Sequence, residues 1–353
     1  MQRRQFLGAL TATCLTAGPL ANRSFANEPI RDDLNWRCET IQTIAQNRAR
    51  RAPVVTGVSL QPKGSNLAIV GDDHHIGIYD IERQSYVDHL SAHTDWVRAA
   101  RFTPNGKTLV TAGNDRTVRI WSTGDWGSPV MTRNHDSAII EVALSPNSPW
   151  LAAVGFEKSL RVYDIQTGRE ALQFECACAD NHAVAFSPDN QLVAAGGRSG
   201  AIRVWNLKTG KLVHESKPHR QRIRSIEFTP QNEIVSAGDD QRIYLINPLQ
   251  RPDQPRAFPR NASKLYATAL LNDGLLATGG SDNQITVWQL ANLRQAGTLK
   301  GHTGTVSCLD FADNKLVSGS YDTQVRLWHT ETYTSSPNPR HTQLKNGWNG
   351  RLN

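Results

Sequence analysis

Residues 301–328 read GHTGTVSCLDFADNKLVSGSYDTQVRLW, and this stretch decides the fold. Its three short apolar runs are separated by Gly, Asp and Asn, and the last run closes on Trp328. The turn residue Asp322 stands six positions before this tryptophan. Short apolar runs broken by such residues predict β-strands joined by tight turns rather than helices.

The same ending recurs along the chain at intervals of 40–42 residues. Each unit closes on an aromatic residue or, once, on isoleucine: Tyr79, Trp121, Tyr163, Trp205, Ile246, Trp288 and Trp328. Six positions before each of these stands a turn residue, in order Asp73, Asp115, Glu157, Ser199, Asp240, Asp282 and Asp322. A period near 40 residues with four short strands in each unit is typical of the blades of a β-propeller.

The seven units predict an all-β fold, a seven-bladed propeller of four-stranded antiparallel blades. The chain lacks a good fourth strand after Trp328, whereas residues 39–44 alternate polar and apolar side chains like an outer strand. An N-terminal strand is therefore expected to complete the last blade, which removes the exposed sheet edges. The predicted blades span about 52–91, 93–133, 135–175, 178–217, 219–259, 261–300, and 302–329 plus 38–48.

Gly301-His302, followed by Ser318, Asp322 and Trp328, resembles the signature of the WD-repeat family, over roughly residues 38–329. In that family the His, Ser/Thr, Asp and Trp of one blade form a hydrogen-bonded chain. Unit five lacks the tryptophan and unit six lacks the histidine. The resemblance implies a structural role for His93, Thr111, Asp115, Trp121, His219, Ser236, Asp240, Thr278, Asp282, Trp288, His302, Ser318, Asp322 and Trp328.

The first 26 residues are interpreted as an export signal. Arg3-Arg4-Gln5-Phe6-Leu7 resembles the twin-arginine motif, and Ser24-Phe25-Ala26 is a small-x-small cleavage pattern. The predicted mature chain begins near Asn27, with a linker over 27–37 and a flexible tail over 330–353. This predicts a periplasmic or secreted protein. The alternatives are a mitochondrial transit peptide, a lipoprotein signal at Cys14, or a structured N-terminal helix in an intracellular protein.

Composition and chemical motifs favour binding over catalysis. Removing the three arginines of the leader lowers the formal net charge from +7 to +4, so no nucleic-acid partner is expected. Cys38, Cys176, Cys178 and Cys308 show no zinc spacing; free thiols are the default expectation, and a bridge between distant cysteines in an oxidising compartment is the alternative. Asp72-Asp73-His74-His75 is interpreted as a solvated turn, with a metal site as the alternative. No catalytic residue, cofactor or bound metal is predicted.

Alignment of the units predicts which residues lie on the face that WD-repeat propellers commonly use to bind proteins or peptides. The predicted partner-binding residues are Trp96, Phe156, Arg198, Arg222, Lys264 and Tyr321. Exposed aromatic residues and arginines carry most of the energy at protein interfaces. The sequence therefore predicts a non-catalytic interaction scaffold, a monomeric propeller within a complex, with its partner unidentified.

Three alternatives stay open. An exported propeller enzyme, or a binder of a small ligand or metal, would use the central channel. Residues 219–224 and Arg48, Arg50 and Arg51 would bind an acidic peptide or an anionic polymer. Trp348 in the tail would anchor a partner.

Overall fold

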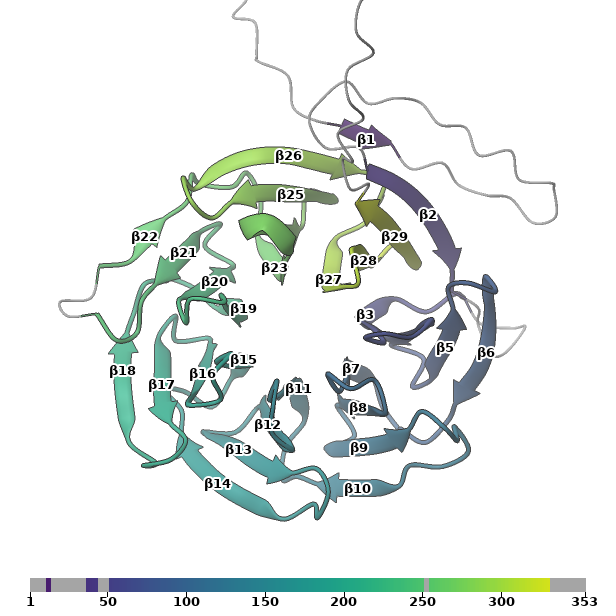
Figure 1. Cartoon of the computed structure of the whole chain (residues 1–353), viewed down its shortest axis with the longest axis horizontal. Helices are drawn as coiled ribbons and strands as arrows, with labels where there is room; N and C mark the ends of the chain where they lie inside the picture. Colours follow the sequence, from purple (N-terminus) through teal and green to yellow (C-terminus); the bar gives the residue numbers. More distant parts are fainter. Residues whose placement is uncertain (1–10, 14–35, 44–50, 251–253, 331–353) are drawn as a thin grey trace, which may run out of the picture.

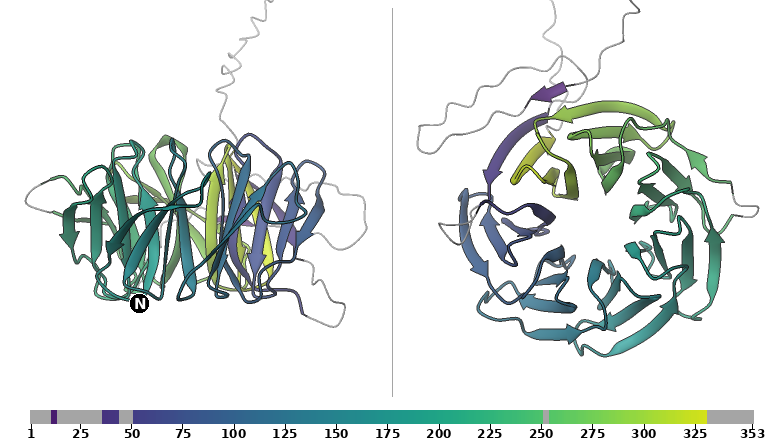
Figure 2. Two further views of the ribbon diagram at one scale, coloured as in Figure 1. Left: turned by 90° about the horizontal axis from the view of Figure 1, so that it is seen from below. Right: turned by 180° about the vertical axis from the view of Figure 1, so that it is seen from behind.

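Seven four-stranded antiparallel sheets are arranged as blades around a central axis (Figure 1). The structure is a computed structural model that describes residues 11–13, 36–43, 51–250 and 254–330. Seen from the side, the blades form a short disc (Figure 2). The prediction of an all-β, seven-bladed propeller is confirmed. Among the described residues the only helix is the short turn η1 (Asn272–Gly274), and no helix is long and apolar enough to cross a membrane.

The first strand of each blade lies nearest the axis. Its residues are mainly small or aliphatic, because neighbouring blades converge here and leave little room for large side chains. These strands are β3 (Val55–Leu60), β7 (Val97–Phe102), β11 (Ile139–Leu144), β15 (Asn181–Phe186), β19 (Ile223–Phe228), β23 (Leu265–Leu270) and β27 (Val306–Ala312).

The second strands are almost completely buried, since each blade is covered on both faces by its neighbours. This explains their nearly continuous apolar sequences, such as Leu109–Ala112. These strands are β4 (Asn66–Gly71), β8 (Thr108–Gly113), β12 (Trp150–Gly155), β16 (Leu192–Gly197), β20 (Ile234–Gly238), β24 (Leu275–Gly280) and β28 (Lys315–Ser320).

The third strands carry the closing aromatic residues that define the repeat. Trp121, Trp288 and Trp328 are all buried between blades. These strands are β5 (Ile76–Asp80), β9 (Thr117–Ser122), β13 (Ser159–Asp164), β17 (Ile202–Asn206), β21 (Ile243–Ile246), β25 (Gln284–Gln289) and β29 (Gln324–Thr330).

The fourth strands form the circumference and are the most polar. In six blades this strand follows the third strand in sequence, and in the seventh it comes from the N-terminal side of the chain. These strands are β6 (Ser85–Leu90), β10 (Met131–Asn134), β14 (Glu170–Glu175), β18 (Leu212–Ser216), β22 (Arg256–Ala257), β26 (Arg294–Lys300) and β2 (Trp36–Gln42).

The ring is closed by β2, which pairs antiparallel with β29. The strand begins at Trp36, two residues before the predicted position, because Trp36 is buried in the core shared with the sixth blade. On the other side, Ile41 packs in the core between the seventh and first blades. The last blade is therefore held by apolar contacts on both of its faces.

A three-residue strand, β1 (Thr11–Thr13), adds parallel to the outer edge of β26. It gives the sixth blade a fifth strand that lies outside the propeller ring (Figure 1). Most of the predicted leader, the predicted linker up to residue 35 and the predicted tail after Thr330 fall outside the described residues.

Candidate functional site

All six predicted partner-binding residues lie on one face of the disc. Trp96, Arg222 and Lys264 directly precede first strands, whereas Phe156, Arg198 and Tyr321 directly follow second strands. Because adjacent strands are antiparallel, the start of a first strand and the end of a second strand lie at the same end of the blade. We call this end of the propeller the top face.

The top face carries the exposed aromatic side chains of the described part of the chain. Phe156 is 48% exposed, Tyr321 46% and Trp96 39%. The other exposed large apolar residues are aliphatic: Val87 and Leu212 lie in outer strands, whereas Val130 and Leu249 lie in loops between third and fourth strands, at the opposite end. Exposed aromatic residues therefore gather on one face only.

Tight backbone packing holds these aromatic residues in place. The backbone N–H of Asn114 donates to the Trp96 carbonyl at 2.8 Å, and Gly113 lies against the same carbonyl. A Cβ atom at Gly113 would stand 2.4 Å from that oxygen, so only glycine permits this approach. The loop bearing Trp96 is thus fixed against the end of β8.

A β-bulge interrupts every first strand at its second residue, a feature that sequence reasoning missed. Bulges leave one residue out of the pairing and redirect its side chain. The redirected residues stand beside the top-face loops, and all of them are partly exposed. They are Thr56, Arg98, Ile140, His182, Arg224, Tyr266 and Ser307.

Bulge residues contact the exposed aromatic residues of the top face in three separate groups, which together we call the aromatic belt. The guanidinium carbon of Arg98 lies 4.7 Å from the centroid of the Trp96 ring, and that of Arg224 lies 5.0 Å from the Tyr266 ring. The Tyr266 and Tyr321 rings are 6.5 Å apart. On the third and fourth blades, Phe156 and His182 make an edge contact at 6.3 Å.

The basic patch predicted over residues 219–224 is largely neutralised. Arg222 Nη2 donates to Asp180 Oδ2 at 2.7 Å, and Arg224 makes two hydrogen bonds to Asp239, at 2.8 and 3.1 Å. Arg222 is also only 27% exposed. Sequence spacing did not reveal these pairs, because Asp180 belongs to the preceding blade.

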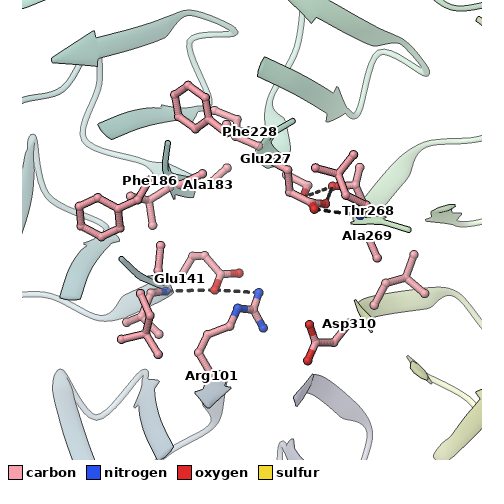
Figure 3. A pocket seen from close by; sticks show the side chains of 18 of the residues that line it. Arg101, Glu141, Ala183, Phe186, Glu227, Phe228, Thr268, Ala269 and Asp310 are labelled. Atoms are coloured by element: carbon pink, nitrogen blue, oxygen red, sulfur yellow. Dashed lines mark hydrogen bonds and ion pairs between the residues drawn. The ribbon is translucent and has the colours of Figure 1, made fainter. Parts of the chain in front are cut away.

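The central channel contains a cavity of about 370 Å³ lined by the first strands. Arg101, Glu141, Glu227 and Asp310 face it (Figure 3), and Arg224 also lines it. Burial raises the pKa of Glu141, Glu227 and Asp310. Arg101 pairs with Glu141 at 3.1 Å.

The remaining two channel carboxylates join neighbouring blades. Asp310 of the seventh blade accepts the backbone N–H of Leu60 in the first blade at 2.7 Å. Glu227 of the fifth blade accepts the N–H of Leu270 in the sixth at 3.0 Å. These contacts link the blades around the axis, so the channel charges already have protein partners.

The family network is complete in the second and seventh blades. His302 Nδ1 lies 2.9 Å from Asp322 Oδ2, and its Nε2 lies 2.8 Å from Ser318 Oγ, which accepts the Trp328 indole N–H at 3.0 Å. The second blade repeats this arrangement with His93, Asp115, Thr111 and Trp121. A carboxylate beside Nδ1 favours the proton on that nitrogen, so Nε2 accepts the hydroxyl hydrogen.

Two blades retain half of this network each. In the fifth, His219 bonds to Asp240 and Ser236, both at 2.9 Å. In the sixth, the Trp288 indole N–H donates to Thr278 Oγ1 at 3.0 Å, while Asp282 accepts the backbone N–H of Gln284.

The third blade has a variant network that the sequence analysis missed. His135 contacts Glu157 at 3.4 Å and the Tyr163 hydroxyl at 3.3 Å. The signal was present, since His135 precedes Glu157 by 22 residues, the same spacing as His93 and Asp115.

The expectation that Cys38 is a free thiol is wrong. Cys38 is disulfide-bonded, and the cysteine that completes the bridge lies outside the described residues. Sequence reasoning had no basis for this pairing, because it depends on where the N-terminal segment lies. Cys176, Cys178 and Cys308 are free.

The cluster Asp72-Asp73-His74-His75 of the first unit forms hydrogen bonds within its own turn and to the neighbouring loop. Asp72 accepts the N–H of Val54 at 2.8 Å and pairs with Arg51 at 3.3 Å, and Asp73 accepts the N–H of His75 at 3.3 Å. In the described ranges, no group of three or more His, Cys, Asp or Glu side chains is arranged to hold a metal ion. Arg48, Arg50 and Trp348 lie outside those ranges.

Comparison with known protein families identifies the repeat. The family model "WD domain, G-beta repeat" matches residues 84–122, 127–164, 180–206, 210–247 and 293–329, together about half of the chain. The chain belongs to the WD-repeat family. The five matches include the closing residues Trp121, Tyr163, Trp205, Ile246 and Trp328, and the WD-repeat propeller is the fold that the structure shows.

Individual WD-repeat relatives match over short stretches. Mitochondrial division protein 1 of Schizosaccharomyces pombe is 45% identical over 58 residues, which cover 16% of this chain and 9% of that protein. The probable E3 ubiquitin ligase complex SCF subunit sconB of Emericella nidulans is 60% identical over 35 residues, covering 10% and 5%. Nuclear distribution protein PAC1 of Komagataella phaffii is 45% identical over 64 residues, covering 16% and 13%.

Proposed function

We propose that this protein is a non-catalytic interaction scaffold whose top face binds a protein or peptide partner. One observation carries the proposal: the exposed aromatic residues Trp96, Phe156 and Tyr321 lie together on that face. Aromatic side chains provide large contact areas at low entropic cost and are enriched where binding energy is concentrated. The names of the relatives, which include a complex subunit, agree with a role in assemblies.

The channel supports this proposal less well than the top face does. Its carboxylates are engaged by Arg101 and by backbone N–H groups of adjacent blades, so a ligand would have to compete with contacts that hold the ring together. The top-face aromatic rings of Trp96, Phe156 and Tyr321 contact only neighbouring side chains at one side and keep 39–48% of their area in solvent.

Affinity capture with matched variants tests the proposal. The variant Trp96→Ala, Phe156→Ala, Tyr321→Ala removes the exposed aromatic residues. The control variant Val130→Ser, Leu249→Ser removes apolar side chains that are more exposed, 66% and 64%, but lie at the opposite end. We expect a partner captured from the native extract to be lost with the triple variant and retained with the control. Equal capture by both, with both folded, would contradict the proposal.

We further propose that residues 1–26 direct export through the twin-arginine route to the periplasm or the exterior. The support is the Arg3-Arg4-Gln5-Phe6-Leu7 motif. Removal of this segment would take away β1 and the cysteine bridged to Cys38, so the mature chain would carry Cys38 as a free thiol and keep all seven four-stranded blades. The test is the subcellular fraction and N-terminal mass of the protein, with Arg3→Lys, Arg4→Lys as the variant. Export that is unaffected by this change, or a retained leader, would contradict the proposal.

A further inference from the structure

Arg98 is a top-face cation without an acidic partner. Its Nε donates to the amide oxygen of Asn114 at 2.9 Å, and its guanidinium stacks on Trp96. Among the described residues no carboxylate lies within ion-pair distance of Arg98, and its two terminal nitrogens make no hydrogen bond. The amide and the indole ring therefore orient the group, while Tyr321 and the Asp95 carboxylate act on its charge without forming an ion pair.

The neighbouring arginines differ in this respect. Arg222 is paired with Asp180, and Arg224 with Asp239. The charge of each arginine is therefore balanced by a carboxylate, through Nη2 of Arg222 and through Nε and Nη2 of Arg224. Arg98 is thus the bulge residue that presents an oriented, unused guanidinium edge on the aromatic belt.

Arg98 also lies within electrostatic range of Tyr321, which belongs to the seventh blade. Burial lowers the pKa of Arg98, since the side chain is partly removed from water. A partly desolvated cation pairs more strongly with an anion than an exposed one does, because water screens it less. The flanking rings of Trp96 and Tyr321 offer apolar contact on the same surface.

Exposed cations without an ion pair also lie on the rest of the face. Arg198, Arg220 and Lys264 form no ion pair within the described residues. Two carboxylates of the face, Asp95 and Asp282, likewise form none there, whereas others are occupied, for example Asp115 and Asp322 by their histidines. The exposed cations, together with Arg98, favour an acidic segment in the partner.

We propose that Arg98, flanked by Trp96 and Tyr321, binds an Asp or Glu side chain of the partner, within a peptide segment that also carries an apolar or aromatic residue. A carboxylate fits the planar guanidinium through two parallel hydrogen bonds, and the adjoining apolar side chain covers the rings. This inference rests on the proposed function, because it names the chemistry that the top face recognises.

The test is selection of a phage-displayed random heptapeptide library on the full chain, followed by fluorescence anisotropy with labelled winners. We expect the winners to contain Asp or Glu beside an apolar or aromatic residue. Arg98→Ala is expected to weaken binding on the order of ten- to a hundredfold, since hydrogen bonds to charged groups contribute about 1.5–3 kcal/mol. Lys211→Ala, which removes an exposed cation between β17 and β18 at the opposite end of the propeller, is the matched control and is expected to change binding less than about threefold.

A double-mutant cycle separates a direct contact from an indirect effect. Replacing the acidic residue of a winning peptide by its amide is expected to weaken binding to the parent chain but not to weaken further the binding to Arg98→Ala. Arg98→Lys, which keeps the charge without the planar fork, is expected to lose part of the affinity. Unchanged melting temperatures show that each variant is folded.

The outcomes that overturn this inference differ from those that overturn the proposed function. Winners without an acidic residue, or winners that bind Arg98→Ala as well as the parent, would refute the Arg98 anchor. If these winners still required Trp96 and Tyr321, the top-face scaffold would stand. Winners unaffected by loss of all three exposed aromatic residues, or the recovery of no peptide, would refute both.

Discussion

Three blades contain different parts of one hydrogen-bond network, and this allows the contribution of each part to be predicted. Thr111 Oγ1, fully buried, accepts the Trp121 indole N–H at 3.0 Å and donates to His93 Nε2, 2.8 Å away. Thr111→Val keeps the shape of the side chain but removes both bonds. No cavity forms, so the cost comes from two buried polar groups that lose their partners.

An unsatisfied buried polar group costs about 1–3 kcal/mol, so Thr111→Val is expected to lower the free energy of unfolding by about 2–6 kcal/mol. Thr278→Val in the sixth blade leaves the Trp288 N–H without its acceptor and removes the 3.3 Å bond from Thr278 Oγ1 to the Thr286 carbonyl; it is expected to cost about 1–3 kcal/mol. Ser236→Ala in the fifth blade leaves only His219 Nε2 without its hydrogen-bond partner, and it is expected to lower the free energy of unfolding by a similar amount. The cost of Thr111→Val should therefore approach the sum of the other two.

Urea denaturation followed by tryptophan fluorescence and circular dichroism measures these differences for the same chain in the same buffer. If Thr111→Val lowered the free energy of unfolding no more than Thr278→Val does, the hydrogen bond between Thr111 and the His93 imidazole would contribute nothing measurable to stability. The account of the network as a continuous chain from Trp121 to Asp115 would then be wrong.

Three further predictions follow from burial and charge. Burial raises the pKa of Asp115 and Asp322, but hydrogen bonds from His93 and His302 outweigh it and hold each pKa at about 2, below the ordinary 3.8. The stability that these two ionised carboxylates contribute to the folded state is thus present above about pH 4 and lost as the pH falls towards 2. Asp115→Asn should therefore make the loss of stability at acid pH less steep in a pH-denaturation curve. An unchanged slope would count against this. Burial raises the pKa of Cys176 and Cys308 to about 12, so a thiol reagent at pH 8 should modify the half-buried Cys178 first. Rapid reaction of all three thiols in the native protein would refute this order of reactivity. Trp36→Ala in the closing strand should lower the free energy of unfolding by about 3–5 kcal/mol in thermal or urea melts. The control Leu212→Ala, at an exposed position in an outer strand, should lower it by less than about 1 kcal/mol. Equal losses would contradict the role of Trp36 in ring closure.

The sequence predicted the fold because the propeller repeats one local solution seven times. The constant spacing between a turn residue such as Asp322 and a closing residue such as Trp328 reports two strands and the turn between them. The closing strand was also predictable, since its alternating pattern near residues 39–44 matched a strand missing elsewhere. Trp36 was missed because a single tryptophan has no periodicity.

The details of the top face were less predictable, because they depend on contacts between blades. Arg222 was chosen as a binding residue from its position, yet Asp180, which neutralises it, lies 42 residues earlier in the chain. Arg98 was overlooked because a bulge redirects its side chain, and a bulge is a property of strand pairing rather than of one strand's sequence. Trp96, Phe156 and Tyr321 were predictable, since their positions follow directly from strand ends.

The measurement that tests the central claim most directly is site-specific photo-crosslinking in the native host. A photoreactive phenylalanine analogue is placed at Phe156 or Tyr321 on the top face, and at the more exposed positions Val130 or Leu249 at the opposite end as controls. If the top face binds the partner, the first two positions should yield the same discrete crosslinked protein and the controls should not. Crosslinks to that protein from Val130 or Leu249, with none from Phe156 or Tyr321, would contradict the account.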